Sequence, residues 1–352
     1  KLGIAQPEGG VATSPDGVRA LARRIGYPVM VRPSYVLGGR AMKAVFSDEE
    51  LDSYLQDIYA EVPGEPSILV DDFIQGAVEV DVDAISDGET TVVAGIMEHI
   101  EGAGVHSGDS ACITPPVTLS PQVISRISDY SVRLAEAIGV RGLVNFQFLV
   151  RGGEVLVIEA NPRASRTIPY LSKAIGHPLA KYAALIKAGK TLKEIGFTEA
   201  PRPRHFSVKE VTLPFLKFPG VLPVLSAEMR STGESMGIAF DPYLAYYKAQ
   251  LGAGVRLPQS GTVRLIGSGF DDLAEGFSEL GFTVVTGDSG TDYDLLIDTD
   301  HPPELRSALE QAIPYVTTKQ AASWTLRAIR AARDAVLSVN ALQSLSDQAQ
   351  PR

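Results

Sequence analysis

Residues 141–166, RGLVNFQFLVRGGEVLVIEANPRASR, constrain the fold of this chain more than any other stretch. Two mostly apolar runs, 143–150 and 154–160, flank an Arg-Gly-Gly link, a pattern typical of a β-hairpin with a three-residue loop. If Val150 faces Glu154, the alternation of side chains along each strand places four large apolar residues against a core. These residues are Phe146, Phe148, Leu156 and Ile158.

The opposite face of the predicted hairpin collects side chains that carry oxygen. They are Asn145, Gln147, Glu159 and, just beyond the strand end, Asn161. Gln147 and Glu159 become diagonal neighbours within reach of one ion, and amide and carboxylate oxygens are ligands that Mg²⁺ accepts. Arg163 and Arg166 follow directly, and the planar fork of arginine suits phosphate or carboxylate. On the hairpin alone, an ordinary sheet with a polar face is the better interpretation, so the rest of the chain decides.

The composition is that of an ordinary globular protein and narrows its partners. A length of 352 residues suggests two or three domains, and 45% hydrophobic with 21% charged residues is typical of a soluble protein. The net charge of −10 argues against sequence-independent nucleic-acid binding, and no apolar run predicts a membrane span or a secretion signal. Cys112 is the only cysteine, which excludes a disulfide framework and fits a reducing cytoplasm. Because the chain opens with Lys1 rather than Met, we expect it to be a piece of something longer.

A strand end and two glycine-bearing loops predict contact with a ligand. Arg32 ends an apolar strand, where an unpaired charge would be costly, so we expect it to meet an anion. Gly38-Gly39 follows in the next loop, where backbone N–H groups could cradle phosphates. Residues 98–109, EHIEGAGVHSGD, form a polar loop of a length that is typically functional. Its histidines, His99 and His106, lack the spacing of a zinc site, and His99 is interpreted as satisfied or solvent-facing.

The segment 77–86, AVEVDVDAIS, alternates apolar and acidic residues and predicts a half-buried strand. Glu79, Asp81 and Asp83 would point outward from one face of that strand. We interpret Asp81 and Asp83 as solvated surface acids.

The C-terminal part of the chain predicts a second kind of architecture. The segment 252–261 is rich in Gly, Pro and Ser and is the expected domain boundary. Beyond it, strands and helices alternate regularly through residues 263–337, which favours a small domain with a parallel sheet. Residues 341–352 are expected to be a polar, frayed tail.

Five motifs in this order carry a specific resemblance. They are RPSYVLGGRAM (32–42), MEHIEGAGVHSGDSA (97–111), IEANPRASRT (158–167), SVKEVTLPFLKFPGV (207–221) and EMRSTGE (228–234). Together they resemble the C-terminal half of the carbamoyl phosphate synthetase large-subunit family, whose second ATP-grasp unit phosphorylates carbamate. The resemblance implies an α/β fold: an α+β ATP-grasp domain over residues 1–255, then a small Rossmann-like parallel α/β domain. That second domain, residues 256–340, resembles a methylglyoxal-synthase-like regulatory domain, shortened between Val285 and Tyr293.

The resemblance also assigns residues to a nucleotide and metal site. Arg32 would contact the ATP phosphates, and Glu79 would hold the ribose. Asp72 and Ile74 would line the adenine, with Asp72 in place of an expected histidine. The implied nucleotide-contacting loop is Gly104, Val105, His106 and Ser107. The implied metal ligands, two of which also border the nucleotide, are Gln147, Glu159 and Asn161.

The remaining assignments concern catalysis and regulation. Arg163 and Arg166 would stabilise the transferring phosphoryl group and the carbamate. Positions that bind the activator ornithine in some family members are occupied by Glu101, Asp109 and Glu210.

The implied activity is the MgATP-dependent phosphorylation of carbamate within a glutamine-dependent carbamoyl phosphate synthetase. The resemblance implies ATP with two Mg²⁺ or Mn²⁺ ions, allows for K⁺, and places the reaction in arginine and pyrimidine biosynthesis. Its implied partners are a glutaminase small subunit and the missing first half of the large subunit. Two alternatives stay open: another ATP-grasp carboxylate–amine ligase, against which the SVKEV and EMRSTGE segments argue, and a non-catalytic regulatory or assembly fragment.

Overall fold

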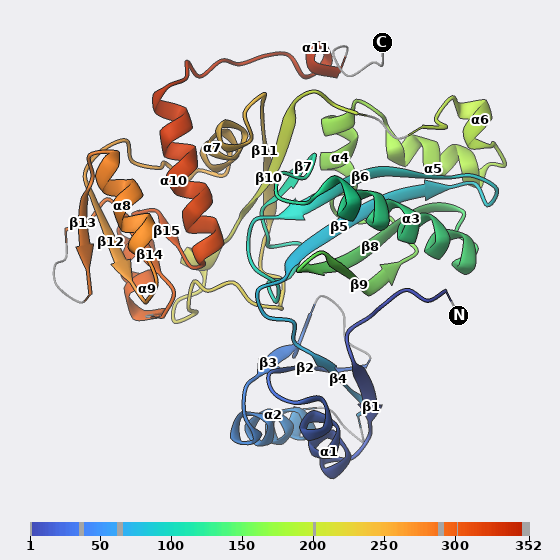
Figure 1. The fold of residues 1–352 in the computed structure, drawn as a ribbon, viewed down its shortest axis with the longest axis horizontal. Coiled ribbons are helices and arrows are strands. Elements are labelled where there is room, and N and C mark those ends of the chain that lie inside the picture. Colours follow the sequence, from blue (N-terminus) through green and yellow to red (C-terminus); the bar gives the residue numbers. More distant parts are fainter. Residues whose placement is uncertain are drawn as a thin grey trace.

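The computed structural model describes residues 2–34, 39–61, 66–199, 202–287, 292–300 and 302–346. These residues form three sheets with helices packed on them, two of the sheets antiparallel and one parallel (Figure 1). The predicted α/β class is therefore confirmed. Within the described ranges, no helix is long and apolar enough to cross a membrane.

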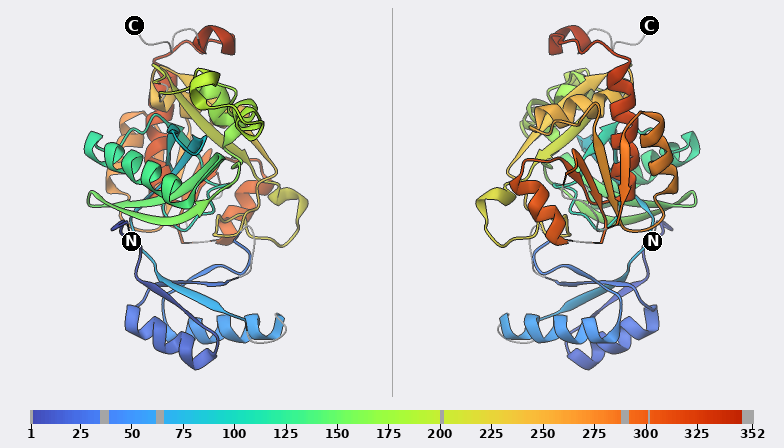
Figure 2. Two further views of the ribbon diagram at one scale, coloured as in Figure 1. Left: turned by 90° about the vertical axis from the view of Figure 1, so that its right-hand side faces the viewer. Right: turned by 90° about the vertical axis from the view of Figure 1, so that its left-hand side faces the viewer.

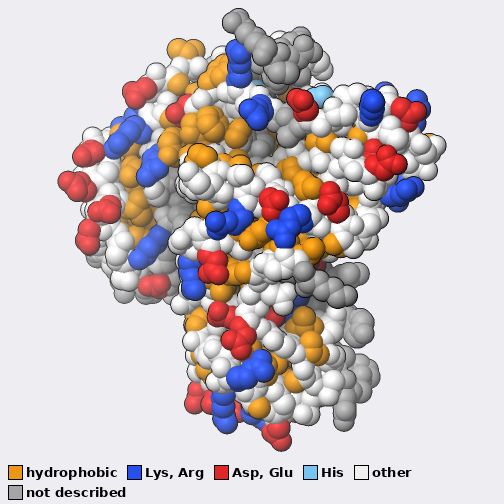
Figure 3. Space-filling model, turned by 45° about the vertical axis from the view of Figure 1, so that its right-hand side comes forward, with side chains coloured by type: hydrophobic (Ala, Val, Ile, Leu, Met, Phe, Trp, Pro, Cys, Tyr) orange, Lys and Arg blue, Asp and Glu red, His pale blue; other side chains and the backbone are white. Residues whose placement is uncertain are grey.

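The N-terminal lobe projects from the rest of the molecule (Figure 1, Figure 3). Its four-stranded sheet has the order β1-β4-β2-β3. The strands are β1 (Gly9–Ala12), β2 (Val29–Pro33), β3 (Lys43–Val45) and β4 (Ile68–Asp72). Two helices, α1 (Pro15–Ile25) and α2 (Asp48–Glu61), cover the face that points away from the body (Figure 2). Ser14 caps α1 as predicted, because its Oγ accepts a hydrogen bond from the Gly17 amide at 3.2 Å.

The body is built on a seven-stranded antiparallel sheet of order β11-β10-β7-β6-β5-β8-β9. Its strands are β5 (Val78–Ser86), β6 (Thr91–His99), β7 (Cys112–Thr114), β8 (Gly142–Arg151), β9 (Glu154–Asn161), β10 (Phe206–Thr212) and β11 (Gly233–Ala239). Helix α3 (Pro121–Ile138) packs on one face. Helices α4 (Ile168–Ile175), α5 (Leu179–Lys187) and α6 (Leu192–Ile195) cover part of the other face. β5 therefore lies inside the sheet with a neighbour on each side.

The hairpin β8–β9 is present, but its register differs from the prediction. Arg151 pairs with Glu154 and Phe148 with Val157, so the loop is the two-residue Gly152-Gly153 turn. Ile158 is then skipped in a β-bulge, and beyond it Gln147 pairs with Glu159.

The one-residue change of register explains why half of the predicted core face was wrong. Phe146 and Phe148 are fully buried against α3, as predicted. Leu156 instead lies on the opposite face, and Ile158 is 37% exposed. Because one extra residue reverses the alternation of side chains, Glu159 still shares a face with Gln147.

The C-terminal part contains the predicted parallel sheet, of order β13-β12-β14-β15. Its strands are β12 (Thr262–Ile266), β13 (Thr283–Thr286), β14 (Leu295–Asp298) and β15 (Tyr315–Val316). The helices of this region are α7 (Pro242–Gly252), α8 (Asp271–Glu279), α9 (Pro302–Glu310) and α10 (Lys319–Arg333). One continuous hydrophobic core joins β10 and α7 to β12 and α10, so the division at residues 255 and 256 stays a prediction. Within the predicted tail, a short helix, α11 (Leu342–Ser346), lies against α4.

Candidate active site

Three neighbouring strands, β5, β8 and β9, align the candidate site residues in three cross-strand rows. The first row is Glu79, Leu149 and Leu156; the middle row is Asp81, Gln147 and Glu159; the last row is Asp83, Asn145 and Asn161. Paired residues point to the same face of a sheet, so all three rows share one surface. The interpretation of Asp81 and Asp83 as solvated acids is wrong, since their side chains are 2% and 0% exposed. The reason is that β5 is an inner strand and that both of its faces are covered.

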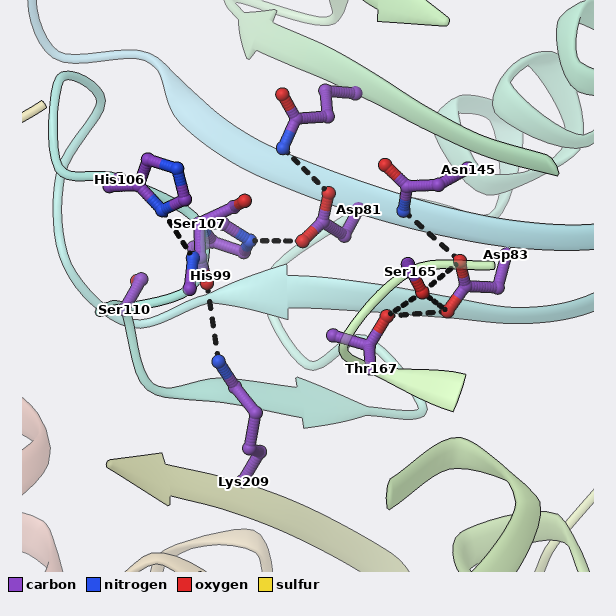
Figure 4. Close-up of polar contacts among 12 residues, drawn as sticks. Asp81, Asp83, His99, His106, Ser107, Ser110, Asn145, Ser165, Thr167 and Lys209 are labelled. Carbon is purple, nitrogen blue, oxygen red and sulfur yellow. Dashed lines mark hydrogen bonds and ion pairs between the residues drawn. The ribbon is translucent and has the colours of Figure 1, made fainter. Parts of the chain in front are cut away.

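The middle row orients a candidate metal ligand. Gln147 donates from Nε2 to Asp81 Oδ1 at 3.1 Å, and the other carboxylate oxygen lies 3.2 Å from His99 Nε2 (Figure 4). An ionised carboxylate only accepts hydrogen bonds, so the Gln147 nitrogen faces Asp81 and its carbonyl oxygen is left for another partner. Burial alone would raise the pKa of Asp81, but the hydrogen bond and charge of His99 outweigh it and hold that pKa below its ordinary value.

The donor set around Gln147 fits a divalent cation bound together with phosphates. Glu159 is exposed and directly opposite Gln147, and Asn161 is partly buried at the end of β9. In the described part of the chain, no group of three or more His, Cys, Asp or Glu residues could hold a metal ion. One carboxylate with two amide oxygens is therefore a sparse set, of the kind that Mg²⁺ completes with water and substrate phosphates.

The last row ties the arginine-bearing loop to the sheet. Asp83 accepts hydrogen bonds from Asn145, Ser165 and Thr167 at 2.5–3.1 Å (Figure 4). Burial raises the pKa of Asp83 to about 6, although these hydrogen bonds act in the opposite direction.

Both predicted catalytic arginines on this loop are exposed and face solvent rather than a buried acid. Arg163 reaches Asn161 Oδ1 only at 3.4 Å. Among the described residues, Arg166 makes no hydrogen bond or ion pair, so its guanidinium group is available to an anion.

The first row and its surroundings provide an apolar surface beside a buried acid. Leu149 and Leu156 pack in one cluster with Ile74, and Ala103 lies against it. Glu79 pairs with Leu149 and is 6% exposed, and burial raises its pKa to about 7. Within the described ranges, no group donates a hydrogen bond to its carboxylate, so the carboxylate oxygens are available to accept one from a ligand hydroxyl.

Two predicted nucleotide segments meet at the edge of this cluster. Asp72 is partly buried at the end of β4, directly before Phe73. Gly104 has φ +101°, and a Cβ at this position would lie 3.0 Å from the Phe73 ring. The close approach explains why a glycine is needed there.

The rest of the predicted nucleotide loop is held in place by hydrogen bonds, one of them from a buried lysine on β10. Lys209 on β10 is 2% exposed, and its ammonium group donates to the Ser107 carbonyl at 3.2 Å (Figure 4). His106 Nδ1 accepts from the Gly108 amide at 2.9 Å, and burial lowers the pKa of His106. Val105 is partly buried beside them.

Arg32, predicted to meet an anion, has one buried donor atom without a partner among the described residues. Its Nε is buried and has no hydrogen-bond partner in the described part of the chain. Gly39, which precedes β3, has φ +70°, and a Cβ there would lie 1.8 Å from the Ala227 carbonyl oxygen. Gly39 is therefore required by packing against residue 227, whereas Gly38 lies outside the described residues.

The acids at the implied ornithine positions fall into two environments. Asp109 accepts from the backbone amides of Arg230 and Ser231 at 2.6 and 2.9 Å, so both of its oxygens are engaged. Glu101 and Glu210 are both buried, and burial together with the nearby Glu101 charge raises the pKa of Glu210 to about 8.

The sequence-based prediction missed the residues that support this site. They are Asp81, Asp83, His99 and Lys209, whereas Asn145 was predicted on the polar face of the hairpin. The strict alternation of acids along 77–86 was the available signal, but it cannot distinguish an outer face from a covered one.

Comparison with known proteins identifies the family. Residues 1–195 match the model of the carbamoyl-phosphate synthase L chain, ATP binding domain. A carbamoyl phosphate synthase large chain of Thermus thermophilus is 57% identical over 350 residues, covering 99% of this chain and 34% of that protein. The corresponding protein of Archaeoglobus fulgidus is 44% identical over 392 residues, covering 99% and 36%. The chain thus spans about a third of the length of the curated relatives it matches.

Solved structures support the ATP-grasp fold. A biotin carboxylase–beta-gamma-ATP complex from Campylobacter jejuni has a TM-score of 0.57 at 17% identity, covering 71% of this chain and 63% of that one. The biotin carboxylase domain of Hydrogenobacter thermophilus 2-oxoglutarate carboxylase, solved with MgADP, ADP and bicarbonate, gives 0.56 at 18%, covering 70% and 61%. At such low identity these structures establish the fold alone. Because the family model matches more than half of this chain, the chain belongs to the carbamoyl-phosphate synthase large-chain family.

Proposed function

We propose that this chain binds MgATP on the three-row surface and transfers the γ-phosphoryl group to carbamate, giving ADP and carbamoyl phosphate. The observation that supports it most is the middle row, where Asp81 turns the Gln147 oxygen away from itself and Glu159 pairs directly with Gln147. A site for phosphoryl transfer needs hard oxygen ligands for a metal ion and positively charged side chains close by. Arg163 and Arg166 follow Glu159 in the sequence and could supply that charge.

The chain's own residues would bind and orient the reactants. Glu79 would accept a ribose hydroxyl, and the cluster around Ile74 would cover the adenine together with Asp72. Arg32 would bind phosphate through its unpartnered Nε. The backbone and side chains of residues 104–107 would close over the nucleotide.

Gln147, Glu159 and Asn161 would hold Mg²⁺ or Mn²⁺, which when bound neutralises phosphate charge during transfer. Arg163 and Arg166 would then hold the carbamate and the equatorial phosphoryl oxygens in line, so that a carbamate oxygen attacks phosphorus as the bond to ADP breaks. This reaction needs no general base, because carbamate is already an anion. A K⁺ ion belongs to the same proposal through the family resemblance alone.

The relatives' greater length supports a wider role. We propose that the chain works with the first half of the large chain, which would supply carbamate, and with a glutaminase small subunit that supplies ammonia. Arginine and pyrimidine biosynthesis in the cytoplasm would consume the product. Residues 256–340 would form the shortened regulatory domain. The buried acids Glu101 and Glu210 would bind the ammonium group of ornithine, whose positive charge would compensate their negative charges.

The experiment is ATP formation from carbamoyl phosphate and ADP by this chain, measured against Mg²⁺ concentration. Activity that requires Mg²⁺ supports the proposal. Nucleotide binding without activity in either direction would favour the non-catalytic fragment, and activity with a different carboxylate would favour another carboxylate–amine ligase.

A further inference from the structure

We propose that Asp81 and Asp83 are positioning residues with separate roles: Asp81 orients the metal ligand Gln147, and Asp83 holds the loop that carries the two arginines. The inference rests on the function proposed above, which gives Gln147 and the arginines their roles. Both aspartates project from one face of β5, two residues apart, so a single strand supports two components of the site.

Asp83 is engaged on both carboxylate oxygens. Oδ1 accepts from Asn145 Nδ2 at 3.1 Å and from Ser165 Oγ at 2.8 Å, and Oδ2 accepts from Thr167 Oγ1 at 2.5 Å (Figure 4). Ser165 and Thr167 flank Arg166 in the sequence, and their hydroxyls also lie 2.7 Å apart. Both neighbours of that arginine are thus tied to one buried group.

The other support of the loop comes from its two ends, where the Arg163 amide donates to the Asn161 carbonyl and the Thr167 carbonyl accepts from the Leu171 amide of α4, each at 2.7 Å. Residues 162–167 belong to no helix or strand, and Arg163 and Arg166 are exposed. A buried carboxylate is costly unless its hydrogen bonds are satisfied, and most of those that Asp83 receives come from this loop. The path of the backbone around Arg166 therefore depends on Asp83.

Asp81 has no bond to that loop. Its two oxygens contact Gln147 Nε2 and His99 Nε2, at 3.1 and 3.2 Å. Without this carboxylate, the Gln147 amide could rotate and present nitrogen, which cannot ligate a cation, instead of oxygen. The two aspartates thus share a strand and a degree of burial but support different groups.

The test compares Asp81→Ala with Asp83→Ala in the full chain, each serving as the control for the other. Loss of Asp81 should raise the Mg²⁺ concentration at half-maximal ATP formation about tenfold, with kcat largely recovered at saturating Mg²⁺. Loss of Asp83 should lower kcat about 100-fold while the Mg²⁺ midpoint moves less than about twofold. Asp81→Asn and Asp83→Asn should each restore part of the loss.

A second measurement does not depend on activity. Trypsin cuts after arginine, so a released loop should be cleaved after Arg163 or Arg166 about tenfold faster in Asp83→Ala than in Asp81→Ala. If Asp83→Ala does not fold, the double variant Ser165→Ala, Thr167→Val removes the same bonds from the loop side.

The outcomes separate the two proposals. Equal effects of both alanine variants on kcat and on the Mg²⁺ midpoint would overturn the positioning roles, and so would unchanged tryptic cleavage in Asp83→Ala. An inactive wild-type chain whose loop is still released by Asp83→Ala would refute the proposed function and leave the structural part of this inference standing.

Discussion

The N-terminal sheet and the central sheet are both antiparallel, yet they bury different kinds of side chain. Among the described residues, every buried side chain of the N-terminal lobe is apolar or Tyr54, and buried carboxylates begin with Glu79 on β5. The central sheet buries Asp81, Asp83 and Lys209 as well. Burying a charge is costly unless it is paired, and this free-energy cost is concentrated in the sheet that carries the candidate site.

The two sheets therefore differ in what they can offer a ligand. The N-terminal sheet is held by ordinary packing and would contribute to the proposed site only from the ends of its two inner strands, through Arg32 on β2 and Asp72 on β4. The central sheet contributes rows of polar groups that are already oriented.

The largest effect is expected for Glu159→Gln in the central sheet. Loss of the only carboxylate in the proposed metal site should lower kcat for ATP formation by roughly 1,000-fold and raise the Mg²⁺ requirement. Glu154→Gln is the matched control, because Glu154 is exposed at the other end of the same strand. An unchanged Mg²⁺ dependence in Glu159→Gln would remove Glu159 from the site.

The next effect concerns the N-terminal lobe and stability alone. Leu51 is 0% exposed in the lobe core, so Leu51→Ala should lower the free energy of unfolding by about 3 kcal/mol. The Mg²⁺ midpoint of the folded protein should not move. Chemical denaturation followed by the activity assay checks both, and a coupled loss of Mg²⁺ affinity would break the separation between the sheets.

Arg32→Met tests the contribution that the lobe would make from the end of β2. We expect the Kd for MgADP to rise about tenfold, because a hydrogen bond between a charged donor and a phosphate is lost. Arg24→Met, an exposed arginine on α1 of the same lobe, should leave the Kd unchanged. Calorimetric titration measures both, and equal affinities for the two variants would contradict the predicted role.

A smaller effect is a pH dependence that belongs to the central sheet. Burial raises the pKa of Glu210 from 4.5 to about 8, so the folded protein holds this proton more tightly than the unfolded chain. The resulting stabilisation is complete below pH 4.5 and is lost as the pH rises through 8. Between pH 6 and 8, Glu210 should therefore contribute a loss of about 2 kcal/mol.

Glu210→Gln should flatten this slope, since glutamine does not titrate. Glu79 and Asp83, with pKa values near 7 and 6, act in the same direction, so some slope should persist. Thermal melts at pH 6 and pH 8 measure the change. Identical slopes in the wild type and Glu210→Gln would show that Glu210 is already ionised when folded.

Much of the local structure follows from the sequence. Ser14 and Pro15 predict the start of α1, and the alternation of strands and helices beyond residue 261 predicts the parallel sheet. The hairpin and the polar face that holds Gln147 and Glu159 are also predicted correctly. These features depend on contacts between residues close in the chain, where the periods of helix and strand are direct evidence.

Only the tertiary structure decided the rest. The bulge at Ile158 keeps Glu159 on the face of Gln147 even though the predicted register was wrong. Asp81 and Asp83 are buried because β6 and β8 flank β5 and because distant segments, including residues 165–167 and Lys209, close over that face. An alternating sequence determines which residues share a face, whereas burial of that face depends on non-local pairing and packing.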